Sequence, residues 1–335
     1  MAWYGPPMRR SVRSGDDLVA ALLAPTEPDV AGELVLLSAP PSTDSGRIDA
    51  AVERLALVPT MVLATPDCPL SAPGVAPLAD AEIAEAGEQL DIELATARSP
   101  LAAAALAVVL RGAESRPIAE GLQLESAVFA ALQGGPEHRA WRADRRVRAR
   151  VSSPTPRLRM ERRDGVLSVT LQRPGRRNAH DRAQRDELAE ALAIVAADPG
   201  LHLELRGDGA SFCSGGDLDE FGTAPDPASA HLVRLERSIA VRLLRLRHRT
   251  TVWMQGPCAG SGVELAACAG RVIAHPDATF VLPELGLGLI PGAGGTVSLV
   301  RRMGRHRTAW LATTGRTIDA ATARRWGLVD EIELF

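Results

Sequence analysis

The most informative part of the chain reads Gly256-Pro-Cys-Ala-Gly-Ser-Gly-Val-Glu264-Leu-Ala266. It is followed by Leu282-Pro-Glu284-Leu-Gly286 and then by Ile290-Pro-Gly-Ala-Gly-Gly-Thr296. The two carboxylates, Glu264 and Glu284, each come beside a glycine-rich segment, and no cluster of metal-ligating residue types accompanies them. The pattern indicates a site that moves protons next to exposed backbone N–H groups.

A second turn of small residues lies upstream and reads Ser211-Phe-Cys-Ser-Gly-Gly216-Asp217. The N–H groups of such a turn can face a ligand because no side chain stands in the way. Two turns of this kind, together with two carboxylates, describe a site that polarises a carbonyl group and transfers protons.

These segments, in this order, resemble the crotonase superfamily, the enoyl-CoA hydratases and isomerases, over residues 157–335. The resemblance implies an α/β fold, a spiral of ββα repeats with helices closing one side. Because members of this family carry out hydration, double-bond shift, dehalogenation, hydrolysis and decarboxylation on one scaffold, the fold alone does not select the reaction.

Composition limits the alternatives. A chain of 335 residues suits about two domains, and its 46% hydrophobic residues suffice for a packed core. The net charge of -3 provides no bulk attraction to nucleic acid or to an anionic membrane. All basic side chains other than histidine are arginine, which excludes a Schiff-base lysine and the lysine of a P-loop.

The cysteines show neither a C-x-x-C motif nor a zinc-ligand spacing, so we expect buried, reduced thiols. They are Cys68, Cys213, Cys258 and Cys268. The apolar run 18–24 is short and follows two aspartates, unlike a signal peptide. No apolar run approaches the ~20 residues that a membrane span needs. We therefore expect a soluble, cytoplasmic protein.

The second half of the chain alternates strand and helix patterns. An Asp164-Gly165 turn predicts a hairpin of two strands, because this dipeptide favours the tight turn of hairpins. The remaining predicted elements are a helix over 181–197, a strand over 201–205, a long helix over about 231–247, and strands over 251–254 and 278–282.

The first half carries three predicted helices, which begin at Ser99-Pro100, Pro117 and Pro136 and run to about residue 150. This segment resembles the carboxy-terminal helical tail that crotonases use to pack subunits and to close the acyl-CoA site. The family's tail would begin just after Ile332, so here the tail lies before the core. We divide the chain into an α/β extension (1–98), a tail-like helical segment (99–150), a linker (151–157) and a catalytic core (157–335).

Two histories explain this order. One is circular permutation, and the other is fusion of a truncated, degenerate crotonase-like copy to a second copy that lost its own tail. Residues 48–65 parallel residues 238–254 as a helix, a turn and a strand, which favours fusion. Any amphipathic helix followed by a strand has a similar pattern, so both histories stay open.

The resemblance assigns roles by position in the motifs. The backbone N–H groups of Gly216 and Ser261 would form an oxyanion hole for the thioester oxygen. Glu264 and Glu284 would hold the attacking water and exchange a proton with the α-carbon, with Glu284 as the proton donor. The alternative for both side chains is structural: Glu264 would cap its own helix and Glu284 would be a solvated loop residue.

Further positions are expected to contact substrate, with weaker support from the sequence. Three arginines flank the turn where the family meets the nucleotide end of coenzyme A, although a solvated basic turn explains them equally well. The full set is Arg173, Arg176, Arg177, Asp217, Gly262, Pro291 and Gly292. Asp219 stands where many relatives have a basic residue. The loop 292–296 is expected to let the backbone pass close to the acyl chain.

The arginines of the third predicted helix could reach the 3′-phosphate of coenzyme A, but a solvated face is the simpler interpretation. They are Arg139, Arg142, Arg145, Arg146, Arg148 and Arg150. A second arginine run in the long helix has no interleaved aromatic residues and does not indicate nucleic-acid binding.

Both glutamates together favour hydration of a 2-enoyl-CoA to the 3-hydroxyacyl-CoA, because a double-bond isomerase can work with one carboxylate. The resemblance implies no metal or redox cofactor, coenzyme A only as part of the substrate, and a homo-oligomer, a trimer or hexamer. The alternatives are another crotonase reaction, including the cofactor-free oxidation of aryl-acetyl-CoA known from relatives with large amino-terminal extensions, or an acyl-CoA-binding protein without activity.

Overall fold

The first sheet of the computed structural model, which describes residues 8–145 and 156–335, is parallel with the strand order β1-β2-β3-β4. The strands are β1 (Arg9–Ser14), β2 (Glu33–Ala39), β3 (Met61–Ala64) and β4 (Ala81–Glu82), connected by the helices α1 (Gly15–Leu23), α2 (Ser45–Leu55) and α3 (Val75–Leu78). Side chains alternate along β2: Val35 and Leu37 share a buried cluster with α1 and α2, whereas Leu34 and Leu36 face the rest of the molecule.

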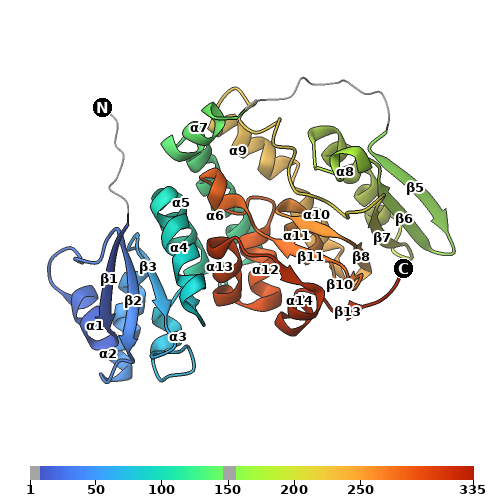
Figure 1. The fold of residues 1–335 in the computed structure, drawn as a ribbon. Coiled ribbons are helices and arrows are strands. Elements are labelled where there is room, and N and C mark those ends of the chain that lie inside the picture. The colour runs from blue at the N-terminus through green and yellow to red at the C-terminus, as the bar shows by residue number, and fades with distance from the viewer. Residues whose placement is uncertain (1–7, 146–155) are drawn as a thin grey trace.

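Four helices follow this sheet. They are α4 (Ala86–Arg98), α5 (Pro100–Arg111), α6 (Ile118–Gln133) and α7 (Pro136–Ala143). The last three begin where the helices were predicted, but α7 ends at Ala143, before Arg145, so the predicted extension of the third helix over 144–145 is wrong. The helices α4 and α5 lie between the first sheet and α13 (Arg305–Thr314) (Figure 1). The predicted cap differs: Ser99 makes no side-chain cap, and the Glu137 carboxylate accepts from Leu101 N at 2.7 Å and Ala102 N at 3.1 Å.

The second sheet has the order β13-β10-β8-β7-β6-β5 and is parallel except for the β5–β6 hairpin. The predicted Asp-Gly turn is confirmed, with φ of 49° at Asp164 and 78° at Gly165. The strands are β5 (Leu158–Arg163), β6 (Val166–Leu171), β7 (His202–Gly207), β8 (Thr250–Met254), β10 (Arg271–Ala274) and β13 (Glu331–Ile332). A small third sheet contains β9 (Pro257–Ala259), β11 (Thr279–Val281) and β12 (Ile318–Asp319).

The helices of this half begin with α8 (Arg182–Ala197), which confirms the predicted helix. The others are α9 (Pro227–Glu236), α10 (Ile239–Arg245), α11 (Ser261–Ala267), α12 (Gly295–Met303), α13 and α14 (Ala320–Trp326), with short 3-10 turns η1 (Pro174–Arg176), η2 (Arg247–Arg249) and η3 (Glu284–Leu287).

The prediction of one long helix over 231–247 is wrong. Two separate N-caps explain the difference. The Asp226 carboxylate accepts from Ser229 N at 2.8 Å and begins α9. The Ser238 hydroxyl accepts from Val241 N at 3.2 Å and begins α10. The helix is therefore interrupted between Glu236 and Ile239.

The two large sheets share an order of connection, β1-α1-β2-α2-β3-α3-β4 in one and β6-α8-β7-α10-β8-α11-β10 in the other, with α9 as an extra helix. Fusion of a degenerate copy would produce this similarity. The predicted division of the chain into domains stays a prediction. One hydrophobic cluster runs from Leu34 in the first sheet through α5 and α6 to Val329 near the end of the chain. The helical segment therefore packs into the core of both halves.

The predicted linker lies largely outside the described residues, as do Arg146, Arg148 and Arg150. Within residues 8–145 and 156–335, no single helix is both long enough and apolar enough to cross a membrane. Only α4 and α5 taken together reach that length and composition, and they bend by 112° at their junction.

Candidate active site

One cavity of about 330 Å³ brings together the predicted oxyanion and acid–base residues. Gly216, Ser261, Glu264 and Glu284 all contribute to its wall. Asp217 and Gly292 also line it, and their contact with substrate stays a prediction. The other predicted contacts are not part of this wall, namely Arg173, Arg176, Arg177, Gly262 and Pro291.

The cavity forms where the two glycine-containing turns pack backbone against backbone. A Cβ on Gly215, whose φ is +96°, would lie 3.0 Å from Ala259 O. A Cβ on Gly262 would lie only 2.4 Å from Cys213 O. Gly262 therefore permits close packing of the turns, which explains its position better than the predicted contact with substrate.

The amides of Gly216 and Ser261 are free to face a ligand. His180 forms a parallel bridge with Gly216, in which His180 N donates to Gly215 O at 2.8 Å and Asp217 N donates to His180 O at 2.9 Å. Because successive peptide groups of an extended chain point to opposite sides, the Gly216 N–H points away from this bridge. Ser261 N begins α11, where a helix leaves its first N–H groups unpaired. No hydrogen bond within the described chain uses either amide.

Glu264 lies in the first turn of α11 and is 2% exposed. Its Oε2 accepts from Ala293 N at 2.7 Å and from Gly295 N at 2.9 Å. Burial raises the pKa of Glu264 well above its usual range, the charges of Glu284 and Glu125 raise it further, and the two amides lower it. The side chain does not cap its own helix, so the structural alternative does not describe it.

Glu284 begins η3 directly after Pro283 and is 7% exposed. Its Oε2 has no hydrogen-bond partner among the described residues. Its Oε1 lies 2.5 Å from where a Cβ on residue 260 would stand, so only glycine, here Gly260 with φ of +47°, leaves room for this carboxyl group. Burial raises the pKa of Glu284 to about 7. Glu284 is thus a buried group, not a solvated loop residue.

The loop 292–296 binds carboxylates, a role that the sequence analysis missed. Its amides alternate: those of residues 293 and 295 donate to Glu264, and those of Gly294 and Thr296 donate to Glu125 of α6 at 2.7 and 2.9 Å. The Thr296 hydroxyl also donates to Glu125 at 2.7 Å. Burial raises the pKa of Glu125 to about 7. Through Glu125, helix α6 therefore fixes loop 292–296, and this loop in turn donates two hydrogen bonds to Glu264.

Several side chains of the wall were not predicted as site residues, among them three from α6 and α9. Phe129 and Gln133 come from α6, and Arg234 comes from α9. Phe129 lies on Gly292, where a Cβ would approach its ring to 2.2 Å. The only signal in the sequence was the resemblance of residues 99–150 to a tail that closes the site, which does not say which side chains face inward.

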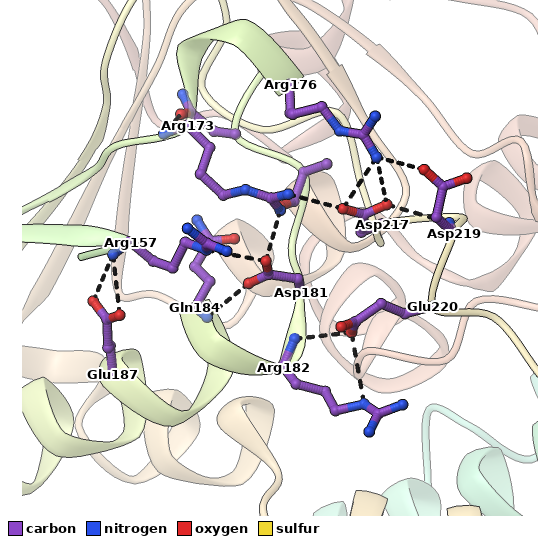
Figure 2. A network of polar contacts seen from close by, with 12 residues as sticks. Arg157, Arg173, Arg176, Asp181, Arg182, Gln184, Glu187, Asp217, Asp219 and Glu220 are labelled. Carbon is purple, nitrogen blue, oxygen red and sulfur yellow. Dashed lines mark hydrogen bonds and ion pairs between the residues drawn. The ribbon is translucent and has the colours of Figure 1, made fainter. Parts of the chain in front are cut away.

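Arg173 and Arg176 belong to an ion-pair network beside the site (Figure 2). Arg173 contacts Asp217 at 3.0 Å and Asp181 at 3.1 Å, and Arg176 contacts Asp217 at 3.2 Å and Asp219 at 2.5 Å. These guanidinium groups are thus engaged by protein carboxylates. Asp219, which stands where many relatives have a basic residue, provides one of the carboxylates that engage Arg176.

Other predicted contacts have ordinary explanations. Arg145 pairs with Asp219 at 2.9 Å, and Arg142 donates to Gly222 O at 3.0 Å. The four cysteines are buried and free, as predicted. Burial raises the pKa of Cys213 to about 11 and of Cys258 to about 12, which keeps both thiols protonated beside the turns.

Comparison with known proteins identifies the family of the second half of the chain. The model of the enoyl-CoA hydratase/isomerase family matches residues 161–333. The chain is 37% identical over 174 residues to 1,2-epoxyphenylacetyl-CoA isomerase of Escherichia coli (strain K12), which covers 50% of this chain and 66% of that protein. It is 33% identical to 2,3-dehydroadipyl-CoA hydratase of the same organism, covering 52% and 68%.

The fold is similar to the crystal structure of enoyl-CoA hydratase from Thermoplasma volcanium GSS1, with a TM-score of 0.50 and 32% identity. The similarity covers 53% of this chain and 72% of that one. The chain spans slightly less than two thirds of the length of the first curated relative named above.

Proposed function

Because the chain belongs to the enoyl-CoA hydratase/isomerase family and has its crotonase fold, we propose that it adds water to the double bond of a 2-enoyl-CoA. The product is the 3-hydroxyacyl-CoA. The observation that carries this proposal is the pair of buried carboxyl groups, Glu264 and Glu284, facing the same cavity as two unused backbone amides, Gly216 N and Ser261 N.

The amides bind the thioester oxygen, where negative charge builds as the β-carbon is attacked. Each such donor typically contributes about 2.7–4 kcal/mol to lowering the barrier. Gly216 and Ser261 supply two donors from turns in direct backbone contact, and we propose that both donate to the same thioester oxygen.

The glutamates divide the proton transfers. Two buried carboxyl groups in one cavity resist double ionisation, so one keeps a proton. Burial and the neighbouring carboxylates raise the pKa of Glu264 at least as far as that of Glu284, an order that would by itself leave the proton on Glu264. We assign the proton by hydrogen bonding instead: two amides donate to Glu264 Oε2, which suits the charged form, whereas Glu284 Oε2 has no donor within the described chain and carries the proton. Glu264 takes a proton from water while the hydroxide oxygen bonds to the β-carbon, and Glu284 gives its proton to the α-carbon. A proton passed from Glu264 to Glu284 restores the starting state.

This chemistry needs only the side chains and amides described, and we propose that it proceeds without a metal or redox cofactor. Coenzyme A enters as part of the substrate. A homo-oligomer, trimer or hexamer, stays a prediction that light scattering of the purified protein can test.

The test follows loss of the conjugated-thioester absorbance with 2-enoyl-CoA substrates and identifies the product by mass, since hydration adds one water. Glu264→Gln and Glu284→Gln should each lower kcat by about 10²–10⁴-fold. Glu190→Gln, on the exposed face of α8, is the matched control and should retain normal rates. Near-normal rates in both active-site variants would overturn the proposal.

An isomerase of acyl-CoA thioesters is the second candidate, favoured by the 37% identity to a relative named 1,2-epoxyphenylacetyl-CoA isomerase. It would convert the same substrates without change in mass. A product of unchanged mass would therefore select isomerisation, and a product heavier by one water would select hydration.

A further inference from the structure

A second cavity of about 160 Å³ adjoins the first. The two share wall residues, including His180, Arg234, Gly292 and Ala293. At roughly 30 Å³ of liquid volume per water, the second cavity has room for about five waters, or a short chain end of similar size. A thioester placed at Gly216 and Ser261 in the first cavity can direct the far end of its acyl group into the second.

Arg234 stands at the junction of the two cavities with an unpaired positive charge. Its guanidinium donates to Ser126 Oγ at 3.4 Å and to Gln133 Oε1 at 3.1 Å, and lies 4.5 Å from the centre of the Phe129 ring. These partners are all neutral. None of the carboxylates in the described chain forms an ion pair with Arg234. Burial lowers the pKa of Arg234, which reflects loss of water around the cation.

Glu125 is the carboxylate whose charge favours the charged form of Arg234, and it lines the same cavity. Its two oxygens, however, accept from Gly294 N, Thr296 N and the Thr296 hydroxyl. Glu125 is therefore committed to the loop and does not bond to the guanidinium.

The other arginines of the second cavity already have a partner. Arg185 contacts Asp186 at 2.8 Å, and Arg237 contacts the same carboxylate at 3.2 Å. Three arginines thus line this small cavity together with Glu125, and Asp186 pairs with two of the three arginines. Arg234 is the arginine of this wall without an ion-pair partner among the described residues. It is half-buried, and a cation that loses part of its water is costly unless an anion compensates it.

We propose that the substrate is an acyl-CoA whose acyl chain ends in a carboxylate, and that Arg234 binds this carboxylate. The proposal rests on the function proposed above, because it places the thioester in the first cavity. A guanidinium can hold a carboxylate through two parallel N–H donors, which distinguishes a chain ending in an anion from one ending in a methyl group. Arg234 is then the residue that determines specificity.

The test compares two substrates of equal length, a six-carbon 2-enoyl-CoA ending in a methyl group and the same chain ending in a carboxylate. Wild type should have at least a tenfold higher kcat/KM for the carboxylate. Arg234→Met should lose this preference by lowering kcat/KM for the carboxylate alone, and Arg234→Lys should restore part of it. Arg54→Met, an exposed arginine of α2, is the control and should keep the wild-type preference.

Calorimetric binding of the two saturated acyl-CoA analogues separates this inference from the proposed reaction. Tighter binding of the carboxylate analogue by wild type but not by Arg234→Met supports the inference, even if neither enoyl-CoA is turned over and the hydratase proposal fails. Equal affinity of wild type for both analogues overturns the inference, even if both enoyl-CoA substrates are hydrated. A preference that persists in Arg234→Met also overturns it.

Discussion

Replacing Glu284 by Gln should stabilise the protein at alkaline pH while strongly lowering its kcat. The Glu284 carboxyl is 7% exposed and its Oε2 lacks a donor, so ionisation places a poorly compensated charge in the cavity. Its pKa is accordingly raised from 4.5 to about 7. A pKa raised on folding contributes stability below the unfolded value, and this contribution is lost as pH rises through the folded value.

The size of the effect follows from that shift. A pKa that rises from 4.5 to about 7 corresponds to about 3 kcal/mol lost by wild type at alkaline pH. Glutamine has nearly the same shape and no charge, so the variant avoids the loss. We expect the advantage of Glu284→Gln in free energy of unfolding to grow by about 2–3 kcal/mol between about pH 5 and pH 8.

Urea unfolding followed by tryptophan fluorescence at both pH values measures this difference. Glu190→Gln, an exposed replacement of the same kind, should show no such dependence on pH. If the difference in free energy of unfolding between Glu284→Gln and wild type stays constant from pH 5 to pH 8, Glu284 does not change its ionisation in this range. The assignment of the shared proton to Glu284 would then be wrong.

Three further predictions concern the amides, the loop and the pH dependence of turnover. Ser261→Pro removes one oxyanion donor at the first position of α11, where proline is tolerated, and should lower kcat by about 10²–10³-fold, whereas Ser261→Ala keeps the amide and near-normal rates. Equal rates in the two variants would exclude the amide as a donor. Glu125→Leu leaves Gly294 N and Thr296 N without acceptors and should destabilise the protein by about 3–5 kcal/mol in chemical unfolding, with loss of turnover because the loop also holds Glu264. Unchanged stability would contradict the contacts described for this loop. The kcat of wild type should fall as pH rises through the range around and above 7, where the proton shared by the glutamates is lost, and a kcat that rises through this range would contradict an acid role for Glu284.

Features that depend on neighbouring residues were predictable from the sequence. The Asp164-Gly165 hairpin forms because these residues adopt the positive φ that the turn requires. Asp181 begins α8 as an N-cap, its carboxylate accepting from Gln184 N at 2.8 Å. The break before Ser238 also had a local signal, a serine at a cap position, but the apolar spacing continued across it and concealed the break.

The candidate site was predictable only in part. The motifs placed Gly216, Ser261, Glu264 and Glu284, because each lies in a distinctive turn or beside one. They did not reveal the partners of these groups. The amides of loop 292–296 looked like a passage for the acyl chain, yet they bind two glutamates, one of them from a helix far earlier in the sequence.

The sequence by itself determined the local elements, the two glycine turns and the family of folds, since these depend on backbone preferences and short spacings. Only the tertiary structure decided which charges are compensated. Glu125 and Thr296 are 171 positions apart, and Arg234 meets Gln133 across 101. Burial and hydrogen bonding of a charge depend on chain segments brought together by packing of the core, and no spacing along the chain encodes that packing directly. For this reason the acid–base pair could be named from the motifs, while its shared proton and the unpaired arginine beside it required the folded chain.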